Sequence, residues 1–227
     1  MKGIRNRRSS ILTGIMQLQY NLIQLKQSLC KIFMPQSDLI DDLDDNYGNW
    51  VALVVKGDDS MPQMNNAFVK KLANTRNMRG IYITINKPYE FVEKNFRKSD
   101  IKLDNVYFLD LVTKYMTKNE GIHVDNCSFV DSPSNLTMLA ISFMQAAKML
   151  QNKNTEKEQC IFIVVDSINT FLVYNDETVV KKFFHFLISK ARELGCKCLL
   201  FSSNLEDVSS LNSLVGDFSD KVVRYGG

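Results

Sequence analysis

The sequence predicts an α/β protein: a mostly parallel sheet covered by helices on both faces, with an N-terminal helical extension. Short apolar runs rich in β-branched residues alternate along the chain with segments in which apolar residues recur every three or four positions. These are the patterns of buried strands and amphipathic helices. The runs are apolar throughout, which is typical of parallel strands buried on both faces. A chain of 227 residues, 45% of them hydrophobic, has room for one substantial domain and an appendage.

The extension is expected over residues 1–36. A short basic arm is followed by seven apolar residues at alternating spacings of four and three, the seam of a coiled coil. These residues are Ile11, Ile15, Leu18, Leu22, Leu25, Leu29 and Ile32. We expect this seam to mediate self-association or pairing with a similar helix. Two alternatives stay open, a helix packed on its own domain and a helix lying on a membrane surface.

Residues 37–49 follow Pro35 and contain five aspartates. Such an acidic run predicts a solvated linker or a short capped turn. We therefore expect the main domain to occupy residues 50–227.

The main domain opens with a strand, a glycine turn and a helix. Residues 51–55 form the apolar run, Gly57 ends it, and Ser60 is placed to cap the helix that follows. The helix is indicated by apolar residues at helical spacing, Phe68, Val69, Leu72 and Ala73. This context is that of a phosphate-binding loop, whose pattern is G-x-x-x-x-G-K-[ST], although a simple turn explains it as well.

The loop lacks most of the chemistry of a phosphate site. The pattern places Pro62, Gln63 and Met64 at the second glycine, the lysine and the hydroxyl residue. Proline has no N–H to donate, glutamine carries no charge, and a thioether does not ligate magnesium. Asp58 and Asp59 would add repulsion of about 4 kcal/mol for each carboxylate 4 Å from a phosphate oxygen. We therefore expect no ordinary ATP binding.

The remaining elements follow in alternation. Strands are expected at residues 81–85, 106–109, 127–130, 161–165, 198–201 and 221–225, and helices at 88–98, 134–150 and 176–194. Phe91 and Val179 are expected to point inward, and residues 113–126 to form a mobile loop. Asp166 and residues 202–204 each follow a strand, so they should meet the glycine loop at the carboxyl edge of the sheet.

The composition limits the function. A net charge of only +3, with no evident stripe of basic and aromatic residues, makes nucleic acid an unexpected partner. Five cysteines without a C-x-x-C pair, and only two histidines, predict no metal site, and we expect no cofactor. We expect a cytoplasmic protein, because no apolar run is long enough for a transmembrane segment and no signal-peptide core is present.

Six segments resemble, in their order and spacing, the RecA-like ATPase domain of the KaiC family over residues 38–226. They are VVKGDDSMPQM, GIYITINKPYEFV, CSFVDSPSNLTML, IFIVVDSINTF, LGCKCLLFSSN and FSDKVVRYG. The resemblance implies a RecA-like fold. It also implies a nucleotide site at the first of these segments.

The same resemblance implies that this nucleotide site is degenerate. The family has two acidic residues, including the catalytic glutamate, after the second strand, where this chain has Asn86 and Lys87; neither is a general base near neutrality. Asp166 matches the Walker B aspartate. We thus expect no catalytic residues and a vestigial site formed by Gly57, Asp58, Asp59, Ser60, Gln63, Met64, Asn86, Lys87, Asp166, Ser202 and Ser203.

Two functions remain as hypotheses. The first is a non-catalytic RecA-like scaffold or regulatory subunit, a pseudo-ATPase that forms a homo-oligomer or a hetero-oligomer with a related RecA-like protein. The alternative is a divergent KaiC-like ATPase that still binds ATP. Calorimetric titration with nucleotide separates them.

Overall fold

The computed structural model describes residues 38–56, 61–118, 121–153, 160–203 and 209–225. The chain divides into two compact units, Met1–Pro35 and Gln36–Gly227, and the second unit is the domain described below. Residues 1–37, with the seven seam residues, and residues 57–60 lie outside the described residues. None of the described helices is long and apolar enough to cross a membrane.

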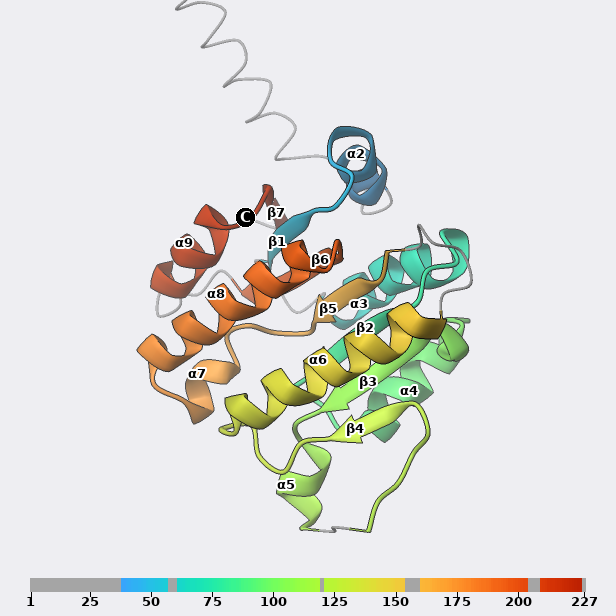
Figure 1. Ribbon diagram of the computed structural model, residues 1–227, viewed down its shortest axis with the longest axis vertical. Coiled ribbons are helices and arrows are strands. Elements are labelled where there is room, and N and C mark those ends of the chain that lie inside the picture. The colour runs from blue at the N-terminus through green and yellow to red at the C-terminus, as the bar shows by residue number, and fades with distance from the viewer. Residues whose placement is uncertain (1–37, 57–60, 119–120, 154–159, 204–208, 226–227) are drawn as a thin grey trace, which may run out of the picture. The chain divides into compact units, whose positions relative to one another are not determined.

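Seven strands form one sheet in which every described pair is parallel (Figure 1). The strand order is β4-β3-β2-β5-β6-β1-β7. The strands are β1 (Val51–Lys56), β2 (Gly80–Thr84), β3 (Val106–Asp110), β4 (Cys127–Phe129), β5 (Phe162–Val165), β6 (Lys197–Ser203) and β7 (Lys221–Tyr225). The predicted α/β fold is confirmed.

Helices cover both faces of this sheet. Alternate residues of β1 show why: Leu53 lies in one hydrophobic cluster and Val54 in the other, because successive side chains of a strand point to opposite faces. Figure 1 shows α6 (Leu136–Lys153) and α8 (Glu177–Glu193) on the near face, with α9 (Ser209–Asp217) beside α8. On the other face lie α3 (Met61–Lys70), which continues as a π-helical turn at Lys71–Thr75, and α4 (Tyr89–Lys98).

Several connections differ from expectation. The predicted loop at 113–126 contains a short helix, α5 (Thr113–Thr117), and α7 (Phe171–Tyr174) and α9 were not predicted. A 3₁₀ turn at Leu103–Asn105 precedes β3. The predicted inward orientation of Phe91 and Val179 is wrong, because these side chains are 47% and 46% exposed.

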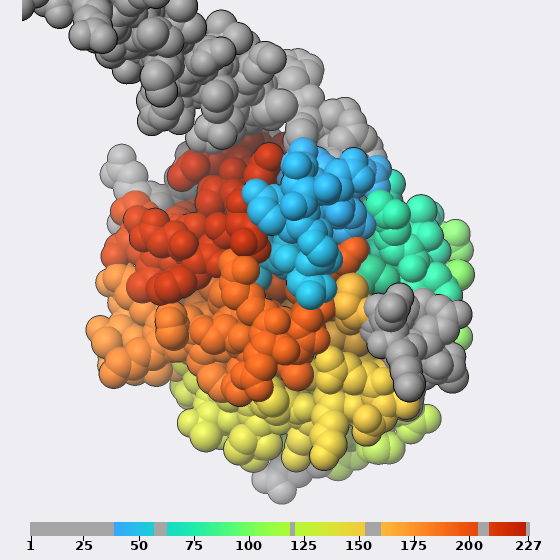
Figure 2. All heavy atoms as spheres, turned by 45° about the horizontal axis from the view of Figure 1, so that its top comes forward, coloured from blue at the N-terminus to red at the C-terminus, as the bar shows by residue number. Residues whose placement is uncertain are grey.

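The acidic run before the first strand is a helix of the domain, so the predicted linker at residues 37–49 is wrong. α2 (Asp38–Asn46) buries three apolar side chains completely, Leu39, Ile40 and Leu43. The aspartates of this helix outnumber its apolar residues, which hides the amphipathic pattern in the sequence. Figure 2 shows this blue N-terminal part of the domain lying between the red C-terminal segment and the teal region of α3 and β2.

Ion pairs explain why so acidic a helix packs on the domain. Asp44 Oδ1 lies 2.5 Å from Lys197 Nζ and accepts a hydrogen bond of 2.9 Å from Trp50 Nε1. The Asp44 and Lys197 side chains are 14% and 12% exposed, so water screens this pair less than a surface pair. Asp41 adds a pair of 2.7 Å with Arg76, and cations beside it lower the pKa of Asp41, with the hydrogen bond from Lys71 the largest cause.

Candidate functional site

The carboxyl ends of four neighbouring strands bring the predicted site residues to one edge of the sheet. Lys56 at the end of β1 is in register with Ser203 at the end of β6. Val165 of β5, which precedes Asp166, is in register with Leu200 of β6. On its other side β5 pairs with β2, after which Asn86 and Lys87 follow. Gly57, Asp58, Asp59 and Ser60 follow β1 and lie outside the described residues.

Asp166 is held by the end of the neighbouring strand β2. Its side chain is buried, Oδ1 accepts a hydrogen bond from the N–H of Ile85 (3.1 Å), and Oδ2 accepts one from the N–H of Asn86 (3.3 Å). The Thr84 hydroxyl lies 3.0 Å from Oδ2. Burial raises the pKa of Asp166 to about 6, although the hydrogen bonds to its carboxylate act in the opposite direction.

The two residues at the position of the family's acids make contacts of their own. Asn86 Oδ1 accepts a hydrogen bond of 2.5 Å from the Thr170 hydroxyl. Lys87 Nζ lies 4.4 Å from the centroid of the Phe91 ring, a cation–π contact. These contacts give Asn86 and Lys87 a role in joining β2 to its surroundings.

Lys56 is a buried cation that the sequence analysis did not single out. It is 1% exposed, its Nζ donates to Asn65 Oδ1 at 2.7 Å, and it lies 4.2 Å from the centroid of the Phe201 ring. Asn65 Nδ2 lies 3.5 Å from the backbone oxygen of Asp166. The sequence does mark Lys56 in one way: it is a lysine that ends an apolar strand directly before Gly57.

A small cavity lies beside Asn65 and Asp166. Its volume is about 60 Å³, and its lining residues are Asn65, Asn66, Tyr82, Asn86, Lys87, Val92, Asn95 and Asp166. Pockets for small organic ligands usually measure about 300–1,000 Å³. This cavity has room for about two water molecules, and burial raises the pKa of the Tyr82 hydroxyl beside it.

The sensor-like residues form a separate hydrogen-bonded group. Asn169 Oδ1 accepts from the Ser202 hydroxyl (2.9 Å) and from the N–H of Ser203 (2.8 Å). Ser202 Oγ also contacts Asn212 Oδ1 in α9. Asn169 Nδ2 and Ser203 Oγ are buried atoms for which the described structure shows no hydrogen-bond partner.

The two residues at the lysine and hydroxyl positions of the phosphate-loop pattern face different surroundings. Gln63 is exposed. Met64 is 3% exposed and belongs to the same hydrophobic cluster as Phe68. Met64 is therefore a core residue of α3. Over the described part of the chain, no three His, Cys, Asp or Glu side chains gather closely enough to hold a metal ion.

Comparison with known proteins finds likeness only in structure. No family model and no curated protein matches the sequence. The KaiC-like protein PH0186 of the hyperthermophilic archaeon Pyrococcus horikoshii OT3 matches with a TM-score of 0.54 and 14% identity, over 77% of this chain and 70% of that one. The uncharacterized protein PH0321 of Pyrococcus horikoshii, solved in complex with an unknown peptide, matches with a TM-score of 0.59 and 11% identity, over 81% and 82% of the two chains. At such identities the likeness concerns the fold alone, and the domain has the RecA-like α/β fold of KaiC-like proteins.

Proposed function

We propose that the protein is a non-catalytic RecA-like protein that acts as a scaffold or regulatory subunit through contact with other proteins. The observation that carries the proposal is the position of Asp166. Its carboxyl group accepts hydrogen bonds from the N–H groups of Ile85 and Asn86. This arrangement joins the ends of β5 and β2, a structural role that requires neither metal nor nucleotide.

The residues around Asp166 support the same conclusion. Asn86 and Lys87 supply no carboxylate to polarise a water molecule. Met64 packs in the core, so it offers nothing to a metal at the hydroxyl position of the phosphate loop. An enzyme of this fold would need each of these functions from some other residue.

The comparison with PH0321 supports a role in binding protein segments. That protein has a similar fold over most of both chains and was solved with a peptide bound. A protein of similar fold can therefore hold a peptide. We extend this use of the fold to the present chain.

One group of observations favours the alternative, a divergent nucleotide-binding protein. Lys56 places a buried cation immediately before Gly57 in the chain. Asn169 Nδ2 and Ser203 Oγ leave polar atoms without partners near the same strand ends, as far as the structure is described. A nucleotide could use such groups in place of the usual loop lysine.

Calorimetric titration of the full chain with Mg-ATP separates the two functions. We expect no binding of micromolar affinity, which corresponds to about −8 kcal/mol, and no release of phosphate. Micromolar binding that is lost in Lys56→Met, while the variant still unfolds cooperatively, would establish the alternative. A partner recovered with the chain and bound equally by Lys56→Met would support the scaffold.

A further inference from the structure

The outer side of α4 carries cations around an exposed aromatic ring. Phe91 is 47% exposed, and Lys94 and Lys98 are exposed as well. These three residues follow one another at spacings of three and four, so they lie in one line along the helix. Lys87, just before the helix, places its Nζ 4.4 Å from the centroid of the Phe91 ring. We call these four residues the α4 stripe.

The opposite side of α4 fixes the stripe in place. Val92 and Phe96 are buried. The Phe96 ring meets the Tyr82 ring edge to face, with centroids 5.1 Å apart, and lies 5.7 Å from the Phe108 ring. The strands β2 and β3 therefore anchor the helix. A surface that is already held in one geometry loses less conformational freedom when a partner binds.

The positive charge of the stripe is not neutralised by α4 itself. Its three lysines form no ion pair with any described residue. Of the two acids in α4, Glu93 is paired with Arg97 at 2.6 Å. Glu90 is exposed one turn before Lys94 and flanks the stripe. The stripe and Glu90 together therefore carry three positive charges and one negative charge.

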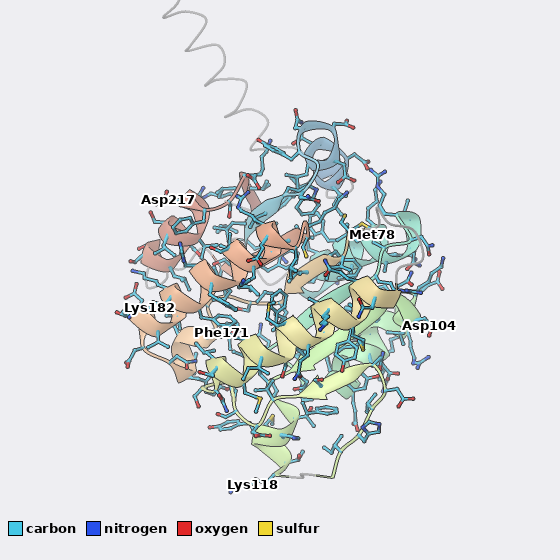
Figure 3. The ribbon with its side chains drawn as sticks, in the orientation of Figure 1. Met78, Asp104, Lys118, Phe171, Lys182 and Asp217 are labelled. Atoms are coloured by element: carbon cyan, nitrogen blue, oxygen red, sulfur yellow. The ribbon has the colours of Figure 1, made fainter. Side chains whose placement is uncertain are left out.

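The elements beside α4 leave this charge in place. α3, which is hydrogen-bonded to the turn after α4, contains no Asp or Glu. Asp100, just past the end of α4, is paired with Lys70 at 3.7 Å. Lys102 and Asp104 are both exposed and their charges cancel; Figure 3 shows Asp104 on the outside of the domain. An exposed ring among uncompensated cations suits a partner that is apolar and negatively charged.

The parts of the chain itself that could cover the stripe are excluded by their charge. The stripe of a second copy would bring like charges together, which costs several kcal/mol. Residues 1–36 contain six Lys or Arg and no Asp or Glu. The acidic helix α2 is already engaged, because Asp41, Asp42 and Asp44 each pair with a lysine of the domain. The complementary charge must therefore come from another protein.

We propose that the α4 stripe binds an acidic helix of another protein, which places an apolar side chain on Phe91 and carboxylates on Lys94 and Lys98. A helix fits because its side chains recur at spacings of three and four, the spacing of the stripe. Complementary charge selects the partner and its orientation. The inference rests on the proposed scaffold function, for which it names the contact surface and the chemistry of the partner.

A single-stranded nucleic acid fits this surface less well. Such a strand carries a phosphate at every nucleotide, and Glu90 repels a phosphate backbone that follows the line of α4. A protein helix can place an uncharged residue opposite Glu90 and keep its carboxylates for the lysines. The position of Glu90 therefore favours a protein.

Fluorescence anisotropy with a synthetic helix tests the surface. The probe is a labelled peptide of about 20 residues with Leu and Glu on one face, and its counterpart carries Gln in place of every Glu. The full chain should bind the acidic peptide with a dissociation constant below about 100 µM, and the Gln peptide at least about tenfold more weakly. Lys94→Glu/Lys98→Glu should weaken binding of the acidic peptide at least about tenfold. Phe91→Ser should weaken binding of both peptides.

A matched control separates a local contact from overall charge. Lys148→Glu/Lys182→Glu makes the same change in net charge at exposed lysines of α6 and α8. Figure 3 labels Lys182 on α8, which covers the opposite face of the sheet. The control should bind the acidic peptide as the parent does. All substituted side chains are on the surface, so each variant should unfold cooperatively at a similar temperature.

The inference is overturned if the parent does not bind the acidic peptide, or if the stripe and control variants bind it with equal affinity. It is also overturned if a labelled oligothymidylate binds the stripe more tightly than the peptide, which would assign the surface to single-stranded nucleic acid. These results do not bear on the titration with Mg-ATP. Micromolar ATP binding would refute the non-catalytic function and leave the peptide measurements unchanged.

Discussion

Replacing Asp166 with asparagine should remove the pH dependence that this buried carboxyl group gives to the stability of the domain. In the folded chain its pKa is raised to about 6, whereas an unfolded aspartate has a pKa of about 3.9. The folded state therefore holds the proton more tightly than the unfolded state. The stabilisation is fully present below about pH 4 and is lost as the pH rises through about 6, opposite to an ion-paired aspartate.

The magnitude follows from the size of this shift. About two pKa units correspond to about 3 kcal/mol between the two ends of the range. The asparagine side chain can still accept the hydrogen bond from Ile85 but loses one or two others, worth about 1 kcal/mol each. At neutral pH the relief of a buried charge offsets this loss. The variant should thus match the parent near pH 7.5 and be less stable below about pH 5.

Urea unfolding followed by the fluorescence of Trp50, the single tryptophan, measures the difference at several pH values between about 4 and about 8. Subtracting variant from parent cancels groups common to both, including Asp41, whose pKa is shifted the other way. Asp45→Asn, at an exposed position of α2, serves as the control. A difference that does not change with pH would refute the assignment of Asp166 as a buried structural carboxyl group.

Three further outcomes are expected. Asp44→Ala should lower the free energy of unfolding by about 3 kcal/mol, because it strands Lys197 in a site where that side chain is only 12% exposed; Asp45→Ala should change it by less than about 0.5 kcal/mol in the same urea titration. Gln63→Lys should create no ATP binding detectable by calorimetry, since one cation does not rebuild the anion site or its metal ligand. Removing residues 1–36 should convert an oligomer into a monomer in sedimentation if the apolar seam pairs between chains. A full chain that is already monomeric and loses stability on this truncation would show that the segment belongs to the core.

The parallel sheet was predicted correctly because a strand buried on both faces is apolar at nearly every position of its sequence. β5 is apolar at every position and was located within one residue. The same reasoning brought Asp166 and Ser202 to one edge of the sheet, since carboxyl ends of parallel strands always meet there.

The errors arose where distant residues decide the outcome. Asp44 looked like part of a solvated run, and only the fold brings Lys197 beside it. Lys56 looked like the polar end of a strand, yet Asn65 and the Phe201 ring enclose its ammonium group. Phe91 follows the same helical period as Val92 and Phe96, but α4 buries only those two and leaves Phe91 47% exposed.

The strand order has a consequence for how the chain is made. The first strand, β1, pairs with β6 and β7 and with no other described strand. About 140 residues lie between β1 and β6, and translation proceeds at about 5–20 residues per second, so β1 waits roughly 7–30 seconds for its first partner. During that interval the segment Val51–Val55 has no sheet to join, and apolar strands in this state aggregate readily. A newly made chain is therefore most prone to aggregation until β6 has left the ribosome and can pair with β1.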